Sequence, residues 1–352
     1  MRGDYAVQCF FVISGFYTAL ILAETYPEGH WKQFYLNRFL RIYPAYWLVL
    51  GVTALGFAVN AGLGNVFRSF HSFQYWQHWR HLLSWKTALS MAISNLFLIG
   101  HDWTIFLKID GSSGELHFTK WYLADEFQPR FLLALPQAWS LAIEVFFYLL
   151  APLLAKRSMK TLFTVVVGSL VLRYWLDAQG LEPAPWSYRF FPSELAFFGA
   201  GMLSYRFYQF THRKPAWERW ASPLAKISLL GFLALCSLQA SWVNRLSLNR
   251  PEGFLFFFCL VFAVPLFFWI SKDSRMDRKI GELSYPVYLV HWGVISALNS
   301  FHFDERLRWG LAVGISLLSS WGLLFALEPV GRWRNRVRAQ ARGAEPRSTH
   351  VS

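Results

Sequence analysis

Long apolar runs alternate with short polar segments along the whole chain. Nine of these runs approach the ~20 residues that a helix needs to cross the hydrocarbon core of a bilayer. They are 5–24, 44–64, 131–155, 161–178, 190–208, 223–243, 254–271, 284–300 and 309–328. A further run, 87–100, is shorter and fits an interfacial, re-entrant or short spanning helix. The pattern predicts an all-α polytopic membrane protein, a helical bundle of nine to ten transmembrane segments.

The composition supports this class and excludes others. Hydrophobic residues make up 55% of the chain and charged residues only 16%, whereas soluble domains carry about 25% charged residues. The net charge is +13, but the basic residues form short clusters between apolar runs instead of one soluble face, so we expect no nucleic-acid partner. The three cysteines lie inside apolar runs and have neither a disulfide framework nor metal-ligand spacing.

The basic clusters predict the orientation of the segments. Most of the 34 Lys and Arg residues lie in one alternate set of polar segments, and few lie in the other set. The rich set comprises 25–43, 156–160, 206–226, 272–282 and the chain after 328. By the positive-inside rule this set is cytoplasmic, which makes 65–130 an external excursion if 87–100 does not cross. We therefore expect one transmembrane domain over 1–334 and a basic cytosolic tail over 335–352. With this orientation the first helix starts outside, so we expect relatives to possess a helix that precedes it.

Arg38 and Arg41 lie one helical turn apart at the mouth of an apolar run. An arginine at the centre of a membrane helix costs roughly 2.5–3.5 kcal/mol, so a pair held at the edge favours an anion-binding role. The alternative is that the pair only fixes orientation.

Two polar patterns occur inside the apolar runs, where polar groups are expensive unless they are paired or used. Ser14 and Gly15 lie near the middle of the first run; the small pair favours close helix approach, and the hydroxyl can also donate into a buried cavity. Ser140, Glu144 and Tyr148 are spaced i, i+4 and i+8 and therefore share one helix face. This face is either a structural hydrogen-bond network or a site with Glu144 as a proton acceptor.

Histidines offer two further candidates. His291 shares a helix face with Ser284 and Tyr288 inside the run 284–300, and it is either a packing residue or a group that transfers protons near neutral pH. His71, His78 and His81 lie among tryptophans in the external region. Because no carboxylate or cysteine completes a metal site there, we favour an interfacial aromatic patch over a metal centre and expect no metal. The sequence carries no phosphate-binding P-loop, no nucleophile elbow and no dinucleotide-binding turn.

Five segments, in this order, resemble the acyltransferase-3 family of membrane O-acyltransferases. They are FFVISGF at 10–16, NRFLRIYPAYW at 37–47, WSLAIEVFFYLLAP at 139–152, LSYPVYLVHW at 283–292 and LEPVGRWR at 327–334. Together they extend over nearly the whole chain. The first segment, with its flanks, is most similar to members that O-acetylate exopolysaccharides or lipopolysaccharide O-antigens.

The resemblance implies an activity and a location. The family takes an acyl group, usually acetyl, from cytosolic acyl-CoA and passes it to a hydroxyl of a cell-envelope polysaccharide or its lipid-linked precursor. It implies acyl-CoA as a co-substrate with no tightly bound cofactor, and a multi-pass protein of the bacterial inner membrane. Arg38 and Arg41 would face the donor, whose phosphates suit a guanidinium fork. The residues expected to line the interior site are Ser14, Tyr43, Ser140, Tyr148, Tyr285 and Tyr288.

The chain departs from the family pattern at two places. Asn37-Arg38 stands where the family usually has two arginines. The family also carries an Arg and a His, taken as the catalytic base, on a helix that would precede this sequence. His291 and Glu144 are therefore substitute candidates for the base. Two alternatives to the enzyme stay open: a transporter or flippase of a lipid-linked glycan, and a catalytically inactive relative. The genomic DNA upstream of Met1 distinguishes a catalytically inactive relative from an active enzyme.

Overall fold

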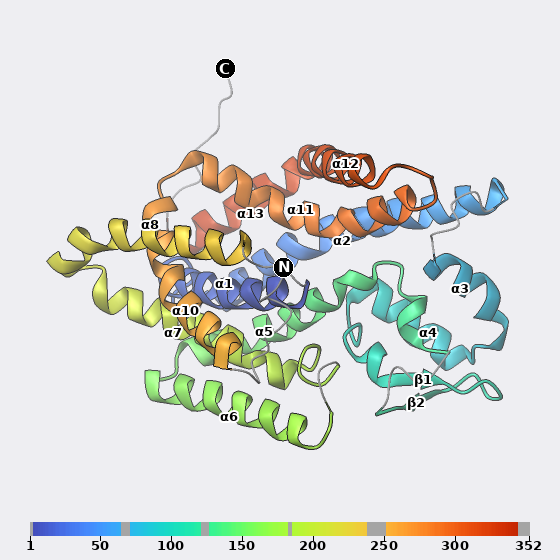
Figure 1. The fold of residues 1–352 in the computed structure, drawn as a ribbon, viewed down its shortest axis with the longest axis horizontal. Coiled ribbons are helices and arrows are strands. Elements are labelled where there is room, and N and C mark those ends of the chain that lie inside the picture. The colour runs from blue at the N-terminus through green and yellow to red at the C-terminus, as the bar shows by residue number, and fades with distance from the viewer. Residues whose placement is uncertain (1–2, 65–70, 121–126, 182–184, 238–250, 344–352) are drawn as a thin grey trace. The chain divides into compact units, whose positions relative to one another are not determined.

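The computed structural model describes the chain except residues 1–2, 65–70, 121–126, 182–184, 238–250 and 344–352 (Figure 1). The described part is helical almost throughout, with one two-stranded antiparallel hairpin. It forms two compact units. Unit 1 comprises 1–31 and 144–278, and unit 2 comprises 32–143 and 279–352. The all-α class is confirmed.

Unit 1 is organised around α7, which packs against α1, α6 and α10. Its helices are α1 (Gly3–Glu24), α5 (Trp139–Ala155) from Glu144 onward, α6 (Met159–Ala178), α7 (Phe191–Thr211), α8 (Pro215–Ser237) and α10 (Pro251–Ser271). The aromatic core of the unit includes the ring of Phe198, which stacks on Phe11 at 4.4 Å and on Phe147 at 4.2 Å between ring centroids. These rings belong to α7, α1 and α5, so the sequence-distant helices share one core.

Two glycines set the close approach of α1 and α7. A Cβ atom on Gly15 would lie 2.1 Å from the carbonyl oxygen of Phe198, and one on Gly201 would lie 2.0 Å from that of Val12. Neither position can carry a side chain unless the backbones separate. The small pair at Ser14-Gly15 therefore does what such pairs do between membrane helices, as predicted.

Unit 2 contains the remaining elements. They are α2 (Trp31–Gly62), α3 (His71–Trp79), η1 (Arg80–Leu82), α4 (Trp85–Phe97), η2 (Trp103–Phe106), β1 (Leu107–Ile109), β2 (Leu116–Phe118), η3 (Pro129–Leu132), η4 (Pro136–Ala138), α11 (Arg275–Leu298), α12 (Glu305–Ala326) and α13 (Glu328–Ala341). Unit 1 includes the beginning of α2, the beginning of α11 and the part of α5 that follows Ile143. Residues 335–341 of the expected tail are part of α13, where Val337 and Ala341 are buried.

The segment expected to be an external excursion folds into a small cluster within unit 2. Met91, Ile109, Phe127 and Leu132 form its buried centre, and Trp76 and Trp79 pack against it. Trp79 stacks on Phe127 at 4.3 Å between ring centroids. These two tryptophans are therefore core residues of the cluster, while Trp85 is 72% exposed.

The histidines of this segment lie at its surface. The side chains of His78 and His81 are exposed, and that of His71 lies outside the described residues. No group of three or more His, Cys, Asp and Glu that could hold a metal ion occurs among the described residues.

Six helices of the described residues are long and apolar enough to cross a membrane. They are Tyr5–Glu24, Trp31–Gly62, Pro136–Ala155, Met159–Ala178, Gly253–Ser271 and Glu305–Ala326. Helices α7, α8 and α11 coincide with the predicted runs 190–208, 223–243 and 284–300 without being among these six, and the end of 223–243 lies outside the described residues. The total of nine to ten crossings stays a prediction. Helix α4 has 13 residues, about 20 Å at 1.5 Å per residue, which is less than the ~30 Å of hydrocarbon.

Three predicted boundaries were wrong. The segment 25–43 is not a loop throughout, because α2 begins at Trp31 and continues through Pro44. The run 131–155 is α-helical only from Trp139, since Pro136 lacks an N–H and disfavours α-geometry at the residue before it; Leu135 has φ −122° and ψ 73°. The segment 272–282 is largely helical because α11 begins at Arg275.

Candidate functional site

The structure brings Ser14, Glu144 and Tyr148 together in unit 1. The Ser14 hydroxyl donates to Oε1 of Glu144 at 2.9 Å, and the Tyr148 hydroxyl donates to the same oxygen. Glu144 is 4% exposed, Tyr148 4% and Ser14 7%. Helix α5 supplies Glu144 and Tyr148 one turn apart, and α1 supplies Ser14 from across the interface.

The hydrogen-bond donors to Glu144 among the described residues are both hydroxyls. Both hydrogen bonds go to Oε1, and among the described residues no donor is bonded to Oε2. A carboxylate held on one oxygen by two donors has its second oxygen available to accept a proton from a bound hydroxyl. Geometrically, Glu144 is thus a candidate general base in a buried part of the unit.

A second buried carboxylate in unit 1 was missed from the sequence. Glu194 of α7 is fully buried, and its Oε1 lies 3.3 Å from Nη1 of Arg173 in α6. The Gln8 side-chain amide donates to the same oxygen at 3.1 Å. Arg173 lies within α6 and is 5% exposed. The sequence signal for this pair is a basic residue, Arg173, and an acidic residue, Glu194, inside neighbouring apolar runs.

Arg38 and Arg41 lie on α2 in unit 2. Arg38 is only 5% exposed, and its guanidinium lies 5.6 Å from the centre of the Phe34 ring. Arg41 is half-buried. The preceding Asn37 donates to the carbonyl oxygen of Arg334 in α13 at 3.1 Å. Arg38 is therefore held inside the α2 surroundings and does not extend into bulk solvent.

The tyrosines of α11 bind the elements of unit 2 to one another. Tyr285 donates to the carbonyl oxygen of Ile42 in α2 at 2.7 Å. The Tyr288 hydroxyl lies 2.6 Å from Oγ of Ser140 and also donates to the carbonyl of Gln137. Both hydroxyls are therefore committed to the interior of unit 2, as polar groups in a membrane helix must be.

His291 is half-buried, and its Nδ1 lies 2.8 Å from the carbonyl oxygen of Tyr288. A carbonyl only accepts, so Nδ1 carries the proton and Nε2 keeps a lone pair in the neutral ring. Ser284, expected on the same face, is exposed and donates back to the carbonyl of Gly281 at 2.7 Å. Such local bonding is common for serine in helices, and it removes Ser284 from the cluster.

Tyr43 has an interaction that its sequence position did not indicate. Its hydroxyl donates to the carbonyl of Phe97 at 2.8 Å, and neighbours on α2 do the same: Tyr46 to Asn95 and Trp47 to Leu96. These carbonyls end α4 and have no partner within the helix. Side chains of α2 therefore satisfy the C-terminal carbonyls of α4.

The expected site residues thus form two groups, each within one unit. Ser14, Glu144 and Tyr148 are hydrogen-bonded in unit 1. The others belong to unit 2; they are Arg38, Arg41, Tyr43, Ser140, Tyr285, Tyr288 and His291.

Comparison with known proteins gives one match. The sequence profile of the acyltransferase-3 family, described as an acyltransferase domain, matches residues 1–326. No curated protein and no solved structure matches the chain. Because the matched region covers most of the 352 residues and the helices include six candidate membrane spans, the chain belongs to the acyltransferase-3 family of multi-pass membrane acyltransferases.

Proposed function

We propose that this protein transfers an acyl group, acetyl in the simplest case, from cytosolic acyl-CoA to a hydroxyl of a cell-envelope polysaccharide or its lipid-linked precursor. Family membership supports acyl transfer. The observation that carries the chemistry is the Ser14–Glu144–Tyr148 arrangement, a buried carboxylate whose hydrogen bonds leave one oxygen for a substrate proton.

The proposed reaction transfers the acyl group from the thioester of acyl-CoA to the acceptor hydroxyl. The acceptor oxygen attacks the thioester carbonyl carbon, a C–O bond forms, and the C–S bond breaks. The hydroxyl proton passes to the base, and the leaving thiolate takes a proton to become CoA–SH. Glu144 is the base we favour, and His291 is the second candidate, because its Nε2 keeps a lone pair.

The arginines supply the donor end of the proposal. Arg38 and Arg41 are separated by one turn of α2, and paired guanidinium groups suit the phosphates of acyl-CoA better than ammonium groups do. Arg41 is half-buried and Arg38 is buried, so the pair combines access with desolvation. Arg41→Ala should weaken use of the donor while the protein stays in the membrane.

The basic segments support the location. The polar ends rich in Lys and Arg support a cytoplasmic donor side in a bacterium by the positive-inside rule, and α13 would lie on that side. The acceptor would then be modified at the inner membrane. The helix expected to precede the first span stays a prediction, and it bears on whether the family's own base joins Glu144.

The test uses the full chain in membrane vesicles with radiolabelled acetyl-CoA and lipid-linked glycan. Label should move to the glycan, and Glu144→Gln should lower the rate by the 10²–10⁴-fold typical of losing a general base. Thr18→Val is the matched control, since Thr18 lies one turn beyond Ser14 and its hydroxyl has no hydrogen-bond partner among the described residues. Movement of unmodified glycan without label transfer would replace the enzyme with a carrier.

A further inference from the structure

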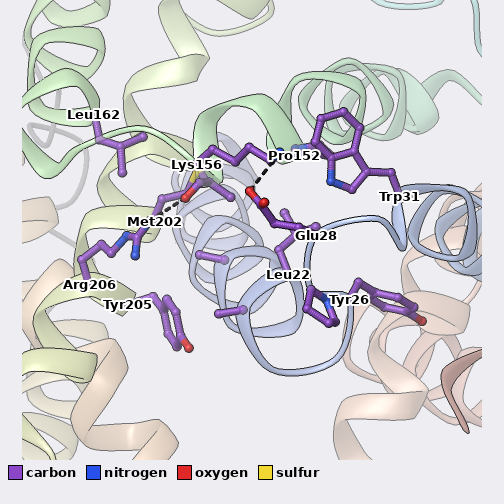
Figure 2. A pocket seen from close by; sticks show the side chains of 14 residues that line it. Leu22, Tyr26, Glu28, Trp31, Pro152, Lys156, Leu162, Met202, Tyr205 and Arg206 are labelled. Atoms are coloured by element: carbon purple, nitrogen blue, oxygen red, sulfur yellow. Dashed lines mark hydrogen bonds and ion pairs between the residues drawn. The ribbon is translucent and has the colours of Figure 1, made fainter. Parts of the chain in front are cut away.

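A cavity of about 300 Å³ opens in unit 1 at the end of α1 (Figure 2). The turn that follows α1, the last turn of α5, the first turn of α6 and the second half of α7 surround it. It lies beyond the Ser14–Glu144–Tyr148 group, since Leu22 and Pro152 line it and follow Ser14 and Glu144 by eight residues on their helices. Two helical turns correspond to about 11 Å.

The walls and the rim of this cavity differ in chemistry. The walls are apolar side chains, among them Leu22, Leu162 and Met202. Lys156 and Arg206 supply positive charge at the rim (Figure 2). Arg206 donates to the carbonyl of Ala155, which directly precedes Lys156, so the two cations are held at the same end of α5.

A carboxylate already binds one of these cations. Oε1 of Glu28 lies 3.0 Å from Nζ of Lys156, and the same Nζ lies 4.5 Å from the centre of the Trp31 ring. Glu28 is 82% exposed and lies in the turn between α1 and α2. An ion pair this exposed is weak. Glu28 therefore marks a place for an anion that a ligand can take over.

The position of the cavity selects the ligand. Helices α1, α5 and α6 are candidate membrane spans, and all of them reach the cavity at the end rich in basic residues, where Arg157 and Lys160 adjoin Lys156. An apolar wall beneath a cationic rim at the end of membrane helices suits an amphiphile, and basic pockets between membrane helices bind anionic lipid headgroups.

We propose that this cavity binds an anionic phospholipid. The phosphate replaces Glu28 on Lys156 and adjoins Arg206, and the first methylene groups of the chain lie along Leu22 and Met202. A soluble phosphate compound would use the cations but not the apolar wall. The proposal is independent of acyl transfer, because it concerns a lipid that is bound and not consumed.

The test measures lipid retained by the full chain purified in detergent after incubation with phosphatidylglycerol or phosphatidylcholine, by native mass spectrometry. Phosphatidylglycerol should be retained preferentially. Lys156→Gln and Arg206→Gln should each lower its retention about fivefold, the equivalent of the ~1 kcal/mol that a basic side chain contributes near anionic lipid. Glu28→Gln should raise retention, which a damaged fold cannot do. Lys160→Gln, an exposed cation outside the cavity lining, is the control and should change little.

Three results would overturn the proposal. They are equal retention of the two lipids, equal loss in the Lys156 and Lys160 variants, and displacement of phosphatidylglycerol by inorganic phosphate or CoA at matched concentration. The last result would identify a soluble anion as the occupant. Failure here leaves the label-transfer experiment untouched, since the two readouts share no step.

Discussion

Unit 1 buries two carboxylates in opposite surroundings. Glu194 faces the guanidinium of Arg173 and the amide of Gln8, whereas Glu144 faces the hydroxyls of Ser14 and Tyr148. Both are almost completely inaccessible. A buried carboxylate beside a cation is compensated in place, whereas hydroxyl donors form hydrogen bonds with a carboxylate without neutralising its charge. The difference separates a carboxylate paired with a cation from the carboxylate that we propose as the base, and it can be tested from each side.

Among these variants, loss of the Arg173 guanidinium should lower the free energy of unfolding the most. Arg173→Met leaves Glu194 buried without this partner, and breaking such a pair typically costs about 3–5 kcal/mol. We expect a drop of that size in the free energy of unfolding in detergent. The double variant Arg173→Met with Glu194→Gln is the control and should recover much of it, because the stranded charge is gone. A loss below about 1 kcal/mol in the single variant would show that the pair is not structural.

Unit 2 contains a third buried carboxylate, Asp102, and neither a cation nor a hydroxyl among the described residues is hydrogen-bonded to it. Asp102 is 1% exposed, and neither of its carboxylate oxygens has a hydrogen-bond partner among the described residues. Burial raises its pKa to about 7 from the ordinary 3.8, against a smaller lowering effect of the backbone N–H groups of Asp102 and Trp103.

The raised pKa has a definite sign for stability. The folded state binds the proton more tightly than the unfolded state, so stability falls as pH rises from 3.8 to about 7 and stays lower above that. Asp102→Asn should therefore be more stable than the parent at pH 8, by up to about 4 kcal/mol, with the gain shrinking toward pH 4.

Thermal unfolding across this pH range measures the effect. Asp110→Asn is the control, and its effect on stability should have the opposite sign. Hydrogen bonds from Ser112 and Ser113 lower the pKa of Asp110, so the Asp110 carboxylate stabilises the fold at neutral pH and loses this effect in acid. A flat difference between parent and Asp102→Asn would show that Asp102 is solvated.

The i, i+4 spacing predicts that Glu144 and Tyr148 share one helix face, but it does not predict which residues of other helices contact that face. Ser140, on the same predicted face, pairs with Tyr288 in unit 2, while Glu144 pairs with Ser14 in unit 1. Hydropathy identified the runs because burying backbone in lipid forces whole helices. It gave no partner on another helix for Ser140 or Glu144, since these partners are set by contacts between segments more than a hundred residues apart, such as Ser14 with Glu144.

Charged residues within apolar runs show the same limit. Arg173 stands near the end of the run 161–178, and its role depends on Glu194, a residue of the next helix. Arg38 and Arg41 lie inside α2 and not in a polar segment before it, because the helix runs through Pro44, where the apolar run begins. Local rules therefore identify polar residues in or beside apolar runs better than they locate helix ends.

The packing that holds both carboxylates can be tested through Gly201. Gly201→Ala forces a Cβ to within 2.0 Å of the Val12 carbonyl oxygen, and overpacking of this kind costs about 1–3 kcal/mol. The free energy of unfolding should fall accordingly. Gly168→Ala in α6 is the control, because nothing lies within 4 Å of its added Cβ, and alanine is the better helix former. Equal stability of the two variants would mean that α1 and α7 can separate without cost.

The smallest change in stability should come from the donors of Glu144, where the effect on catalysis decides the comparison. Ser14→Ala and Tyr148→Phe each remove one hydrogen bond to Oε1, which costs about 0.5–1.5 kcal/mol of stability. If Glu144 acts as the base, losing a donor misorients it, and the maximal rate of label transfer should fall about tenfold for each 1.4 kcal/mol of lost transition-state stabilisation. The KM for acetyl-CoA should stay the same, since neither residue belongs to the proposed donor site. Gln8→Ala removes the corresponding donor from Glu194, and it should lower stability to a similar degree while the rate is kept. A rate loss in the Gln8 variant equal to that in the Ser14 variant would mean that the two carboxylates do not differ in role.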